Sequence, residues 1–424
     1  MKMKKININK GEKIVIVGGG FAGLQLAKTL RNKDVKVLLV DKQNHHQFQP
    51  LLYQIASARL EPASISFPFR KVFQSYSNID FRMADVEKIY PVQKKILTSC
   101  GQITYDHLVI ATGCKTNYFG NVQMSENALS MKTTQEAIKI RNRVLVSFEQ
   151  EIFASEAEKE ALNNIIIVGA GPTGVELSGA FAELKKDVLP KDYPSLDFTK
   201  LNIILIEGSK YTLSNMSDDA KKDSRKYLEE LGVDVRTETI VNSYDGNVAI
   251  LSTGEKIPTK NLIWAAGVIG NVIEGLPQED VIRNRYKVNR YNKLVNFENI
   301  YALGDVAYME TEKYPKSHPQ LANVAINQAK NLGKNIIRSL ENKPLKEYEY
   351  NDLGIMATIG KHKAVVDLPF FKFSGVIAWY IWMFLHLMLI LSVRNKLIIF
   401  INWAWSYITK DTSLRLILFS EKKK

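Results

Sequence analysis

Cysteine is almost absent from this chain of 424 residues, which contains only Cys100 and Cys114. The two lie in different segments and do not form a Cys-x-x-Cys pair, so the sequence excludes a disulfide scaffold and a structural zinc site. Redox chemistry through paired cysteines lacks its second sulfur. Histidine is scarce as well, with six residues. No further ligand accompanies His45 and His46, so we expect a loop packed on a cofactor rather than a metal site.

Acidic residues are too few to balance the basic ones. There are 44 Asp and Glu against 57 Lys and Arg, which gives a formal net charge of +13. The excess gathers at the two ends of the chain, and no basic block interleaved with aromatic residues occurs in the middle. A membrane surface therefore fits the charge better than nucleic acid does. The first apolar run, residues 14–17, is too short for a signal peptide, so we expect the cytoplasmic side.

Two segments of the chain resemble each other, KIVIVGGGFAGLQLAKTL at 13–30 and NIIIVGAGPTGVELSGAF at 164–181. Each contains a β-branched run, a glycine-rich turn and a helical pattern. Each is followed by a second buried strand that ends in an acid, Asp41 or Glu207. The duplication predicts an α/β protein with two doubly wound, Rossmann-like sheets. The length of the chain also predicts two or three domains.

The first motif, Gly18-x-Gly20-x-x-Gly23, predicts a dinucleotide-binding turn. The first glycine permits the tight turn, the second lets the backbone approach a pyrophosphate, and the third lets the helix pack on the strand. The helix N-terminus supplies free N–H groups to the phosphate, and Asp41 is placed to accept a hydrogen bond from a ribose hydroxyl. A plain structural turn is the alternative, but strand, helix and acid are all in register.

The second motif is Gly169-x-Gly171-x-x-Gly174, and Glu207 ends the strand that follows it. A carboxylate at this position accepts the 2′-hydroxyl of NAD and repels the 2′-phosphate of NADP. Lys210 lies close in sequence and weakens that selection, so the sequence favours NADH over NADPH without fixing it. A repeat kept only for packing is the alternative.

Two such motifs in one chain suggest two nucleotides. FAD with NAD is the simplest pair, because hydride passes from nicotinamide to flavin when the two rings stack. Small residues follow three further strand-like runs, at 107–113, 261–267 and 299–305. They fit a flavin domain that is split in sequence by the NAD domain. Asp305 suits the ribityl chain of the flavin or, alternatively, the N-cap of a helix.

Several longer segments resemble type II, non-proton-pumping NADH:quinone oxidoreductases, and the similarity runs over nearly the whole chain. These segments are NHHQFQPLLYQIA (44–56), GAGPTGVELSGAFAE (169–183), WAAGV (264–268), YALGD (301–305) and a tail with GVIAWYIWMFLHL and NWAWSYIT. The resemblance implies a pyridine nucleotide-disulfide oxidoreductase-like enzyme that transfers a hydride from NADH to bound FAD. Two electrons then pass to a membrane quinone, menaquinone or ubiquinone, without proton pumping.

The motifs and the resemblance together assign the cofactor contacts. Those to FAD are Gly18, Gly20, Phe21, Ala22, Gly23, Asp41, Lys42, Val86, Ala111, Thr112, Gly113, Gly304, Asp305, Gln320 and Leu321. Those to NADH are Gly169, Gly171, Pro172, Thr173, Gly174, Glu207 and Gly267. Glu176 matches a family glutamate near flavin and nicotinamide, where burial would raise its pKa and it would relay protons or hold the nicotinamide. A solvated glutamate in the first helical turn is the alternative.

The predicted quinone site departs from the family pattern, which is Ala-Gln-x-Ala-x-Gln after a proline. Here Asn323 and Asn327 replace both glutamines. They share a face of a predicted helix, but their shorter side chains put quinone affinity and head-group choice in doubt. Ala322 and Ala325 still allow the helix to approach a ring, and Gln54 is assigned to the same site. An ordinary amphipathic helix is the alternative.

Three other functions compete with this one. Sulfide:quinone oxidation needs redox cysteines beside the flavin, and a soluble ferredoxin-type reductase has no use for an apolar tail. A flavin-binding redox sensor that has lost turnover stays open because of the two asparagines.

The end of the chain is a separate apolar module. Residues 373–393 are almost wholly apolar and aromatic, a basic break follows at 394–396, and further apolar runs cover 397–408 and 414–419. The first run is borderline for a spanning helix, so we favour amphipathic helices that lie in one leaflet, as the resemblance also implies. A spanning helix and a buried dimerisation helix are the alternatives, and a homodimer stays open. The expected domains are an FAD-binding domain at 1–125 and 276–345, an NADH-binding domain at 126–275 and the membrane-anchoring module at 346–424.

Overall fold

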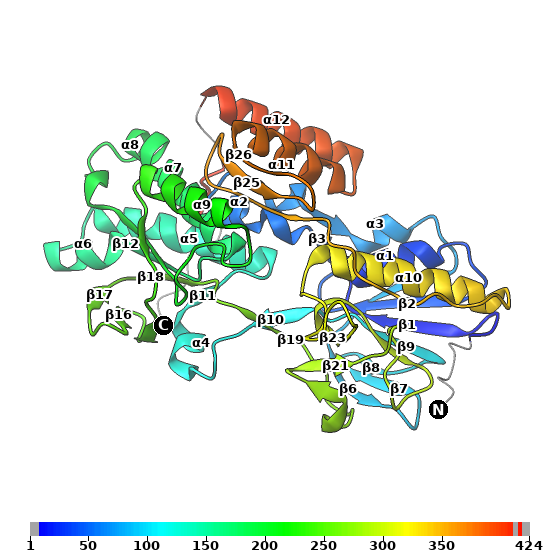
Figure 1. Cartoon of the computed structure of the whole chain (residues 1–424). Helices are drawn as coiled ribbons and strands as arrows, with labels where there is room; N and C mark the ends of the chain where they lie inside the picture. The colour runs from blue at the N-terminus through cyan, green and yellow to red at the C-terminus, as the bar shows by residue number, and fades with distance from the viewer. Residues whose placement is uncertain (1–7, 410–413, 418–424) are drawn as a thin grey trace. The chain divides into compact units, whose positions relative to one another are not determined.

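The computed structural model describes residues 8–409 and 414–417, which form two compact units (Figure 1). The first unit contains the chain up to residue 47, residues 67–115 and residues 268–352. The second contains residues 48–66, residues 116–267 and the chain from residue 353 onward. Each unit is therefore discontinuous in sequence, and the short segment 48–66 belongs by its contacts to the second.

The first unit is built on a five-stranded parallel sheet of order β22-β9-β1-β2-β5. Its strands are β1 (Lys13–Val17), β2 (Lys36–Asp41), β5 (Ile79–Met83), β9 (His107–Ile110) and β22 (Ile300–Ala302). Valine, isoleucine and leucine fill β1 and β9 because helices and loops cover both faces of a central parallel strand. Helices α1 (Phe21–Leu30) and α10 (Ala322–Leu340) pack against each other beside this sheet (Figure 1).

Shorter elements complete the first unit, and several of them share one apolar core with the sheet. They are β3 (His45–Gln47), α3 (Phe69–Phe73), β6 (Val86–Tyr90), β7 (Lys95–Thr98), β8 (Gly101–Thr104), β19 (Val268–Gly270), η4 (Gln278–Asp280), β20 (Val281–Ile282), β21 (Arg285–Lys287), η5 (Gly304–Val306) and β23 (Ala307–Tyr308). Strands β4 (Ser66–Pro68) and β10 (Cys114–Thr116) lie where the chain changes unit.

The second unit repeats the plan with a five-stranded parallel sheet of order β11-β18-β12-β13-β14. Its strands are β11 (Leu129–Ser130), β12 (Asn164–Val168), β13 (Asn202–Ile206), β14 (Asp234–Arg236) and β18 (Asn261–Trp264). The helical segments before the tail are η1 (Gln49–Leu51), α2 (Leu52–Ala56), η2 (Pro62–Ser64), α4 (Val122–Asn127), α5 (Thr134–Glu151), α6 (Glu156–Leu162), α7 (Pro172–Asp187), α8 (Leu189–Asp192), η3 (Phe198–Lys200) and α9 (Asp218–Glu230). The two parallel sheets confirm the α/β fold that the duplicated motif predicts.

Two antiparallel sheets accompany the parallel sheet of the second unit. The first consists of β15 (Val241–Tyr244), β16 (Val248–Leu251) and β17 (Lys256–Pro258). The second consists of β24 (Ile355–Thr358), β25 (Ala364–Asp367) and β26 (Lys372–Gly375), and it leads into the helices α11 (Val376–Leu389) and α12 (Val393–Thr409). Strand β24 packs on α7, and by its contacts the described part of the chain from residue 353 onward belongs to the second unit.

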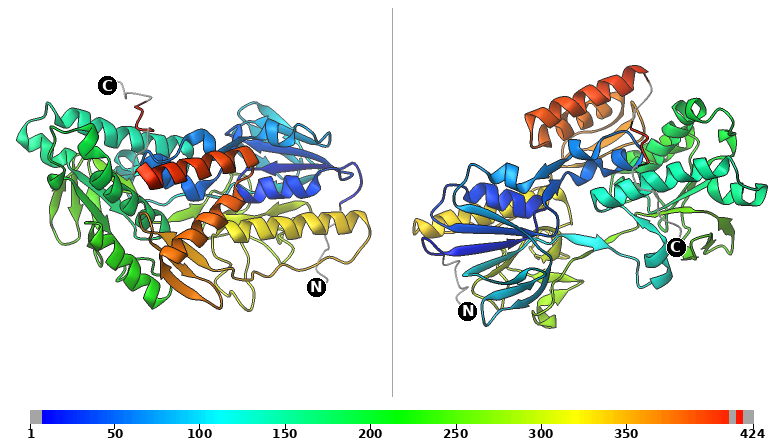
Figure 2. Two further views of the ribbon diagram at one scale, coloured as in Figure 1. Left: turned by 90° about the horizontal axis from the view of Figure 1, so that it is seen from above. Right: turned by 180° about the vertical axis from the view of Figure 1, so that it is seen from behind.

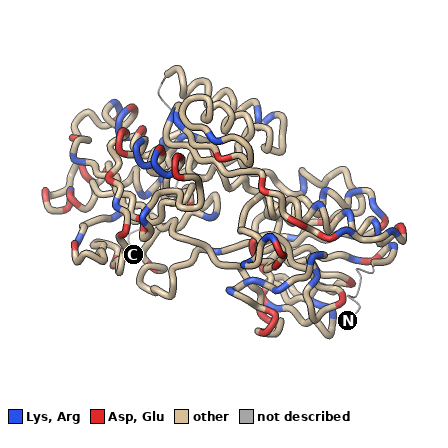
Figure 3. The backbone as a smooth tube through the Cα atoms, viewed as in Figure 1, with Lys and Arg blue, Asp and Glu red and all other residues tan. Residues whose placement is uncertain are grey.

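Helices α11 and α12 lie side by side at the surface of the second unit (Figures 1 and 2). They carry few charged residues (Figure 3), and large apolar side chains stand exposed on both. The break between them falls at residues 390–392 and not at 394–396 as the sequence predicts. The basic residues instead begin α12, and Lys396 Nζ donates back to the Met388 carbonyl 2.9 Å away at the end of α11. Within the described residues, neither these helices nor any other has the length and apolarity needed to cross a bilayer.

Two glycines let α7 and the turn after β24 touch through their backbones. A Cβ atom at Gly179 would lie 2.7 Å from the Gly360 nitrogen, which is closer than real Cβ contacts come. Gly360 itself has a φ of +69°, a left-handed conformation that disfavours other residues. The close approach therefore requires glycine on the helix and on the turn.

We predict that Gly179→Ala destabilises the second unit by about 1–3 kcal/mol, because the added methyl group forces α7 away from the turn. Urea denaturation followed by tryptophan fluorescence measures this, since all five tryptophans lie in the second unit. Lys186→Ala, at an exposed position of the same helix, is the control and should change the stability by less than about 0.5 kcal/mol. Equal stability of the two variants would contradict the packing argument.

Candidate functional site

The first glycine turn leaves open space where a pyrophosphate would approach. Gly18 has a φ of +101°, and a Cβ atom at Gly23 would lie 1.8 Å from the Gly18 carbonyl oxygen, so both positions require glycine. A Cβ atom at Gly20, by contrast, would meet nothing within 4 Å. Asp41 at the end of β2 accepts hydrogen bonds from the backbone nitrogens of Gly19 (2.6 Å) and Gln43 (2.7 Å). Burial raises the pKa of Asp41 against these two bonds. The turn and its acid thus fit the ribose and diphosphate of a dinucleotide.

The other predicted FAD contacts gather in the first unit, at and around the carboxyl ends of its strands. Ala111, Thr112 and Gly113 follow β9, Gly304 and Asp305 lie in η5 after β22, Val86 begins β6, and Lys42 follows Asp41. The Gln320 side-chain nitrogen donates to the Asp305 carbonyl (2.9 Å), and Cys114 Sγ donates to the Asp305 carboxylate (3.0 Å). Phe21, Ala22 and Gly23 open α1, and Leu321 is the N-cap of α10.

Two residues contact the backbone of the predicted FAD site in ways that the motifs did not predict. Gln328 on α10 is fully buried, and its Oε1 atom accepts the Gly304 N–H at 2.8 Å. The imidazole of His46 is 3% exposed and lies 2.9 Å from the Gly19 carbonyl oxygen, and burial lowers its pKa to about 4. His46 therefore lies against the glycine turn as a neutral side chain. No sequence signal identifies Gln328, because its partner Gly304 lies 24 positions away and only the fold brings the two together.

The second glycine turn repeats this geometry in the second unit. Gly169 has a φ of +101°, and a Cβ atom at Gly174 would lie 1.9 Å from its carbonyl oxygen, whereas one at Gly171 meets nothing within 4 Å. Pro172 and Thr173 then form the first turn of α7. Glu207 after β13 accepts hydrogen bonds from the backbone nitrogens of Ala170 (2.6 Å) and Ser209 (2.8 Å), which fixes its carboxylate at the turn.

Two further features bear on the second nucleotide. Gly267 follows β18 with a φ of +116°, and the ring of Phe119 lies 3.3 Å from the position of a Cβ atom there. The ammonium group of Lys210 lies over the ring of Tyr211, 5.4 Å from its centroid. The ammonium group of Lys210 thus contacts an aromatic ring that lies four positions after Glu207 in the sequence.

Glu176 is buried on α7 and not solvated. It is 9% exposed, and its Oε1 atom accepts one long hydrogen bond, 3.4 Å, from the backbone nitrogen of Thr358 on β24. Burial raises the pKa of Glu176 to about 8, against the lowering effect of that bond. The carboxyl group is therefore mostly protonated at neutral pH and able to exchange a proton there.

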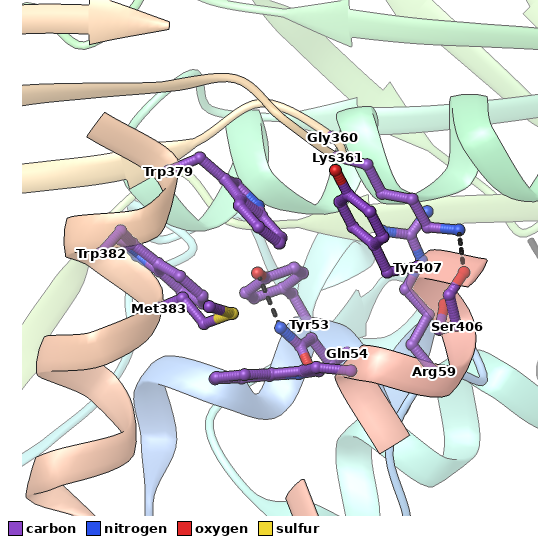
Figure 4. A pocket seen from close by; sticks show the side chains of 11 residues that line it. Tyr53, Gln54, Arg59, Gly360, Lys361, Trp379, Trp382, Met383, Ser406 and Tyr407 are labelled. Carbon is purple, nitrogen blue, oxygen red and sulfur yellow. Dashed lines mark hydrogen bonds between the residues drawn. The ribbon is translucent and has the colours of Figure 1, made fainter. Parts of the chain in front are cut away.

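An aromatic pocket opens in the second unit (Figure 4). It holds about 500 Å³ of space that protein atoms do not fill, part of it open to solvent. Its lining residues are Tyr53, Gln54, Arg59, Gly360, Lys361, Trp379, Trp382, Met383, Trp403, Ser406 and Tyr407. Figure 4 shows Trp379, Trp382 and Met383 on one side and Arg59, Lys361 and Ser406 on the other. A flat, uncharged ring with polar edges fits such a pocket.

A chain of hydrogen bonds runs from this pocket to the neighbourhood of Glu176. The Trp403 indole donates to Gln54 Oε1 (2.8 Å), and Gln54 Nε2 donates to the Tyr53 hydroxyl (3.0 Å). The Tyr53 hydroxyl shares a hydrogen bond of 3.1 Å with Thr358 Oγ1, and the Thr358 N–H donates to Glu176. Burial, and then the charge of Glu176, raise the pKa of Tyr53. The two acids therefore lie within electrostatic reach of each other.

The structure divides the predicted quinone contacts between the units. Gln54 lines the pocket of the second unit. Asn323 and Asn327 lie in the first turns of α10 in the first unit, half-buried and one helical turn apart, with Ala322 and Ala325 beside them. The sequence did not single out Tyr53 or Thr358, and it assigned Trp403 to the membrane interface and not to a pocket. The tail motif NWAWSYIT contained Trp403, but nothing in the sequence paired it with Gln54.

Comparisons with known proteins agree with this geometry. A family model described as pyridine nucleotide-disulphide oxidoreductase matches residues 12–329, and one described as NDH2 C-terminal domain matches residues 353–410. A type II NADH:quinone oxidoreductase of Mycobacterium tuberculosis is 31% identical over 417 residues, which cover 94% of this chain and 88% of the relative. The chain belongs to the type II NADH:quinone oxidoreductase family. It is a flavin-dependent oxidoreductase that oxidises NADH and reduces quinone, with FAD and NAD(H) as its cofactors.

Two solved structures share the fold. NDH2 of Plasmodium falciparum, determined in complex with NADH, matches with a TM-score of 0.89 at 21% identity, over 97% of this chain and 100% of that one. A sulfide:quinone oxidoreductase of Aquifex aeolicus matches with a TM-score of 0.73 at 22% identity, over 91% and 92%. This chain thus shares its fold with a sulfide:quinone oxidoreductase, the enzyme class against which the scarcity of cysteine argues.

We predict that Gly20→Ala weakens FAD binding about 10- to 100-fold without destabilising the apoprotein. The added methyl group meets no protein atom, but it would occupy the space through which the pyrophosphate approaches the backbone. Gly23→Ala should lose FAD and also lower the melting temperature, because its methyl group meets the Gly18 carbonyl. Flavin absorbance after purification and melting of the apoprotein by circular dichroism separate the two effects. The matched control is Gly171→Ala, which should weaken NADH and retain FAD. Loss of FAD in this variant would reverse the order of the two nucleotides.

Proposed function

We propose that this type II NADH:quinone oxidoreductase binds FAD at the first glycine turn and NADH at the second, and that the aromatic pocket receives the quinone head group. Bound FAD supplies the chemistry of accepting a hydride from NADH and passing two electrons to quinone. The residues of the chain orient the nucleotides, exclude water and supply protons.

The observation that carries the proposal is that Thr358 contacts both the pocket and Glu176: its hydroxyl ends the hydrogen bonds that start at the pocket wall, and its backbone N–H donates to Glu176. Reduction of a quinone to a quinol consumes two protons besides two electrons, so the pocket needs a proton source that is shielded from bulk water. The carboxyl group of Glu176, with a pKa of about 8, holds a proton at neutral pH. Because this pKa is close to neutral pH, the group can also give the proton up. Tyr53 and Gln54 connect the neighbourhood of this acid to the pocket wall.

The nucleotide contacts support NADH as the preferred electron donor. Both oxygens of Glu207 are held by backbone N–H groups, so the carboxylate keeps a fixed position. A fixed negative charge there accepts a ribose 2′-hydroxyl and repels a 2′-phosphate. The contact of Lys210 with the Tyr211 ring reduces its ability to offset that repulsion.

We propose attachment to the cytoplasmic face of a membrane, and the tail supports membrane attachment with α11 and α12 lying in one leaflet. Their exposed apolar side chains include Ile377, Phe384, Leu397, Phe400 and Trp405. Large apolar side chains exposed in such number on two neighbouring helices mark a membrane or protein contact. The positive net charge adds attraction to anionic lipids.

We predict that Glu176→Gln slows the reoxidation of the reduced enzyme by quinone about 10- to 100-fold, because the amide cannot supply a proton. In the wild type this rate should fall as the pH rises through about 8, where Glu176 loses its proton. Stopped-flow spectroscopy of the flavin from pH 6 to 9 measures both effects, with reduction by NADH as the internal control. A variant that retains the pH profile of the wild type would exclude Glu176 as the proton source.

Stability provides an independent check on the same residue. The pKa of Glu176 is higher in the folded protein than the ordinary value of 4.5, so its contribution to stability is fully present below pH 4.5 and is lost as the pH rises through about 8. Glutamine does not undergo this loss. The melting temperature of Glu176→Gln relative to the wild type should therefore increase between pH 6 and pH 9.

We predict that Phe400→Asp combined with Trp405→Asp weakens binding to vesicles that contain one quarter anionic lipid, because both side chains are exposed on α12. Cosedimentation measures the effect, and high salt should release the wild type only in part. Ile240→Asp, at an exposed apolar position outside the tail, is the control. Unchanged vesicle binding together with a smaller oligomer would show that a second copy of the chain covers this face instead.

A further inference from the structure

Arg59 lines the aromatic pocket, and its guanidinium group is paired with the buried carboxylate of Glu183. Its Nη2 atom forms an ion pair with Glu183 on α7 and donates to the Ala180 carbonyl at 3.2 Å. The side chains of Arg59 and Glu183 are 16% and 8% exposed. Both hydrogen bonds that the structure shows for Arg59 within the described residues use Nη2, and Arg59 lines the pocket, so Nε and Nη1 are available to donate to a bound molecule.

Glu183 is itself fixed by a second segment. Its Oε1 atom accepts the backbone N–H of Lys361, and a Cβ atom at Gly360 would lie 2.6 Å from the same oxygen. The carboxylate therefore joins α7, the segment that follows α2 and the turn after β24. Because its two oxygens have separate donors, it has little freedom to rotate, and Arg59 is held in one place.

Removing a charge pair from water has a desolvation penalty that can exceed the attraction between the charges, so a buried pair is weak support for a purely stabilising role. A clamp between segments could be made from apolar groups at lower cost. The position of this pair suggests a further role, because its cationic end lines a pocket whose other walls are mainly tryptophan, tyrosine and methionine. In such surroundings a positive charge acts on a bound molecule more strongly than it does in water.

We propose that Arg59 is a catalytic residue for quinone reduction, which holds the quinone oxygen that becomes negatively charged, and that Glu183 is the positioning residue that aims it. This inference rests on the proposed function of the pocket. It assigns roles to two residues on opposite sides of one ion pair.

The chemistry of the step gives Arg59 its task. NADH gives up two electrons and a proton as hydride, and the two electrons reach the quinone through FAD. The quinone takes up one proton, supplied by Glu176, at one oxygen, while the other oxygen bears a negative charge until the proton that left NADH with the hydride reaches it, so that NADH, one further proton and quinone give NAD and quinol. A guanidinium donates charge-assisted hydrogen bonds to that oxygen and forms no covalent bond. It favours the charged species over the neutral quinone, which is the differential binding that catalysis requires.

Lys361 is the other cation in the wall and suits this task less well. Its Nζ atom donates to the Ser406 carbonyl at 3.0 Å, so its charge is directed to the end of α12 (Figure 4). Its ammonium group also lacks the planar fork with which an arginine holds one partner and presents further N–H groups to another.

Binding of an anionic quinone tests the proposal without turnover. The probe is 2-hydroxy-1,4-naphthoquinone, which is an anion at neutral pH, compared with the neutral 2-methyl-1,4-naphthoquinone, both titrated into the oxidised, FAD-loaded enzyme. The wild type should bind the anion more tightly than the neutral ring. Arg59→Met should weaken anion binding at least 10-fold and neutral binding less than about 3-fold. Arg225→Met, which removes an exposed arginine of α9, is the matched control and should change neither.

Two further variants keep the test decisive if Arg59→Met does not retain FAD. Arg59→Lys keeps the charge and loses the fork, so it should weaken anion binding several-fold. Glu183→Gln leaves Arg59 in place without its anchor and should also weaken anion binding several-fold, with quinone kcat lowered more than the KM is raised. If the anion binds all variants as tightly as the wild type, Arg59 is only a clamp. If Trp382→Ala leaves binding of the neutral quinone unchanged, the pocket assignment itself fails.

Discussion

Two carboxyl groups on one helix hold the segment 358–361 of the second unit against that helix. Glu176 and Glu183 are seven residues apart on α7, so they lie on the same face two turns apart. Each accepts a backbone N–H from the segment 358–361. A carboxylate withdrawn from water needs such donors, and an unpaired one costs far more than the loss of an ordinary contact. Gly179, between them, lets the segment come close enough to provide them. Hydrogen bonds to these two carboxyl groups thus help, together with apolar packing, to hold the segment 358–361 on α7.

The same two carboxylates have opposite chemical characters because their partners differ. Within the described residues Glu176 has one long hydrogen bond and no cation, so it keeps a proton at neutral pH. Glu183 has the guanidinium of Arg59 and serves as a fixed counterion. One helix therefore presents a proton carrier and the anchor of a cation to the same pocket neighbourhood. The apolar walls strengthen both effects, because they exclude the water that would screen charge.

How much of this the sequence predicts depends on the separation of the partners. The glycine turns are local: each needs a positive φ at one glycine and space at another, and both demands are visible within six residues. The acids Asp41 and Glu207 follow from the strand that succeeds each turn. The pocket is different, because Tyr53 meets Thr358 from 305 positions away and Gln54 meets Trp403 from 349. Arg59 and Glu183 are 124 positions apart. No periodicity or spacing links such pairs. The break in the tail was misplaced for a related reason: Lys396 caps the preceding helix, and composition alone treated it as a separator.

Helix α12 serves the pocket as well as the surface. It contributes Trp403 to the wall, and its Ser406 carbonyl receives the ammonium group of Lys361. An enzyme cut before residue 403 would thus lose one side of the cavity together with its exposed apolar face. Inactivity of a shortened enzyme could not distinguish a missing lipid contact from a missing cavity wall, whereas substitutions on the outer side of α12 could. The helix that faces outward is also the one that completes the cavity.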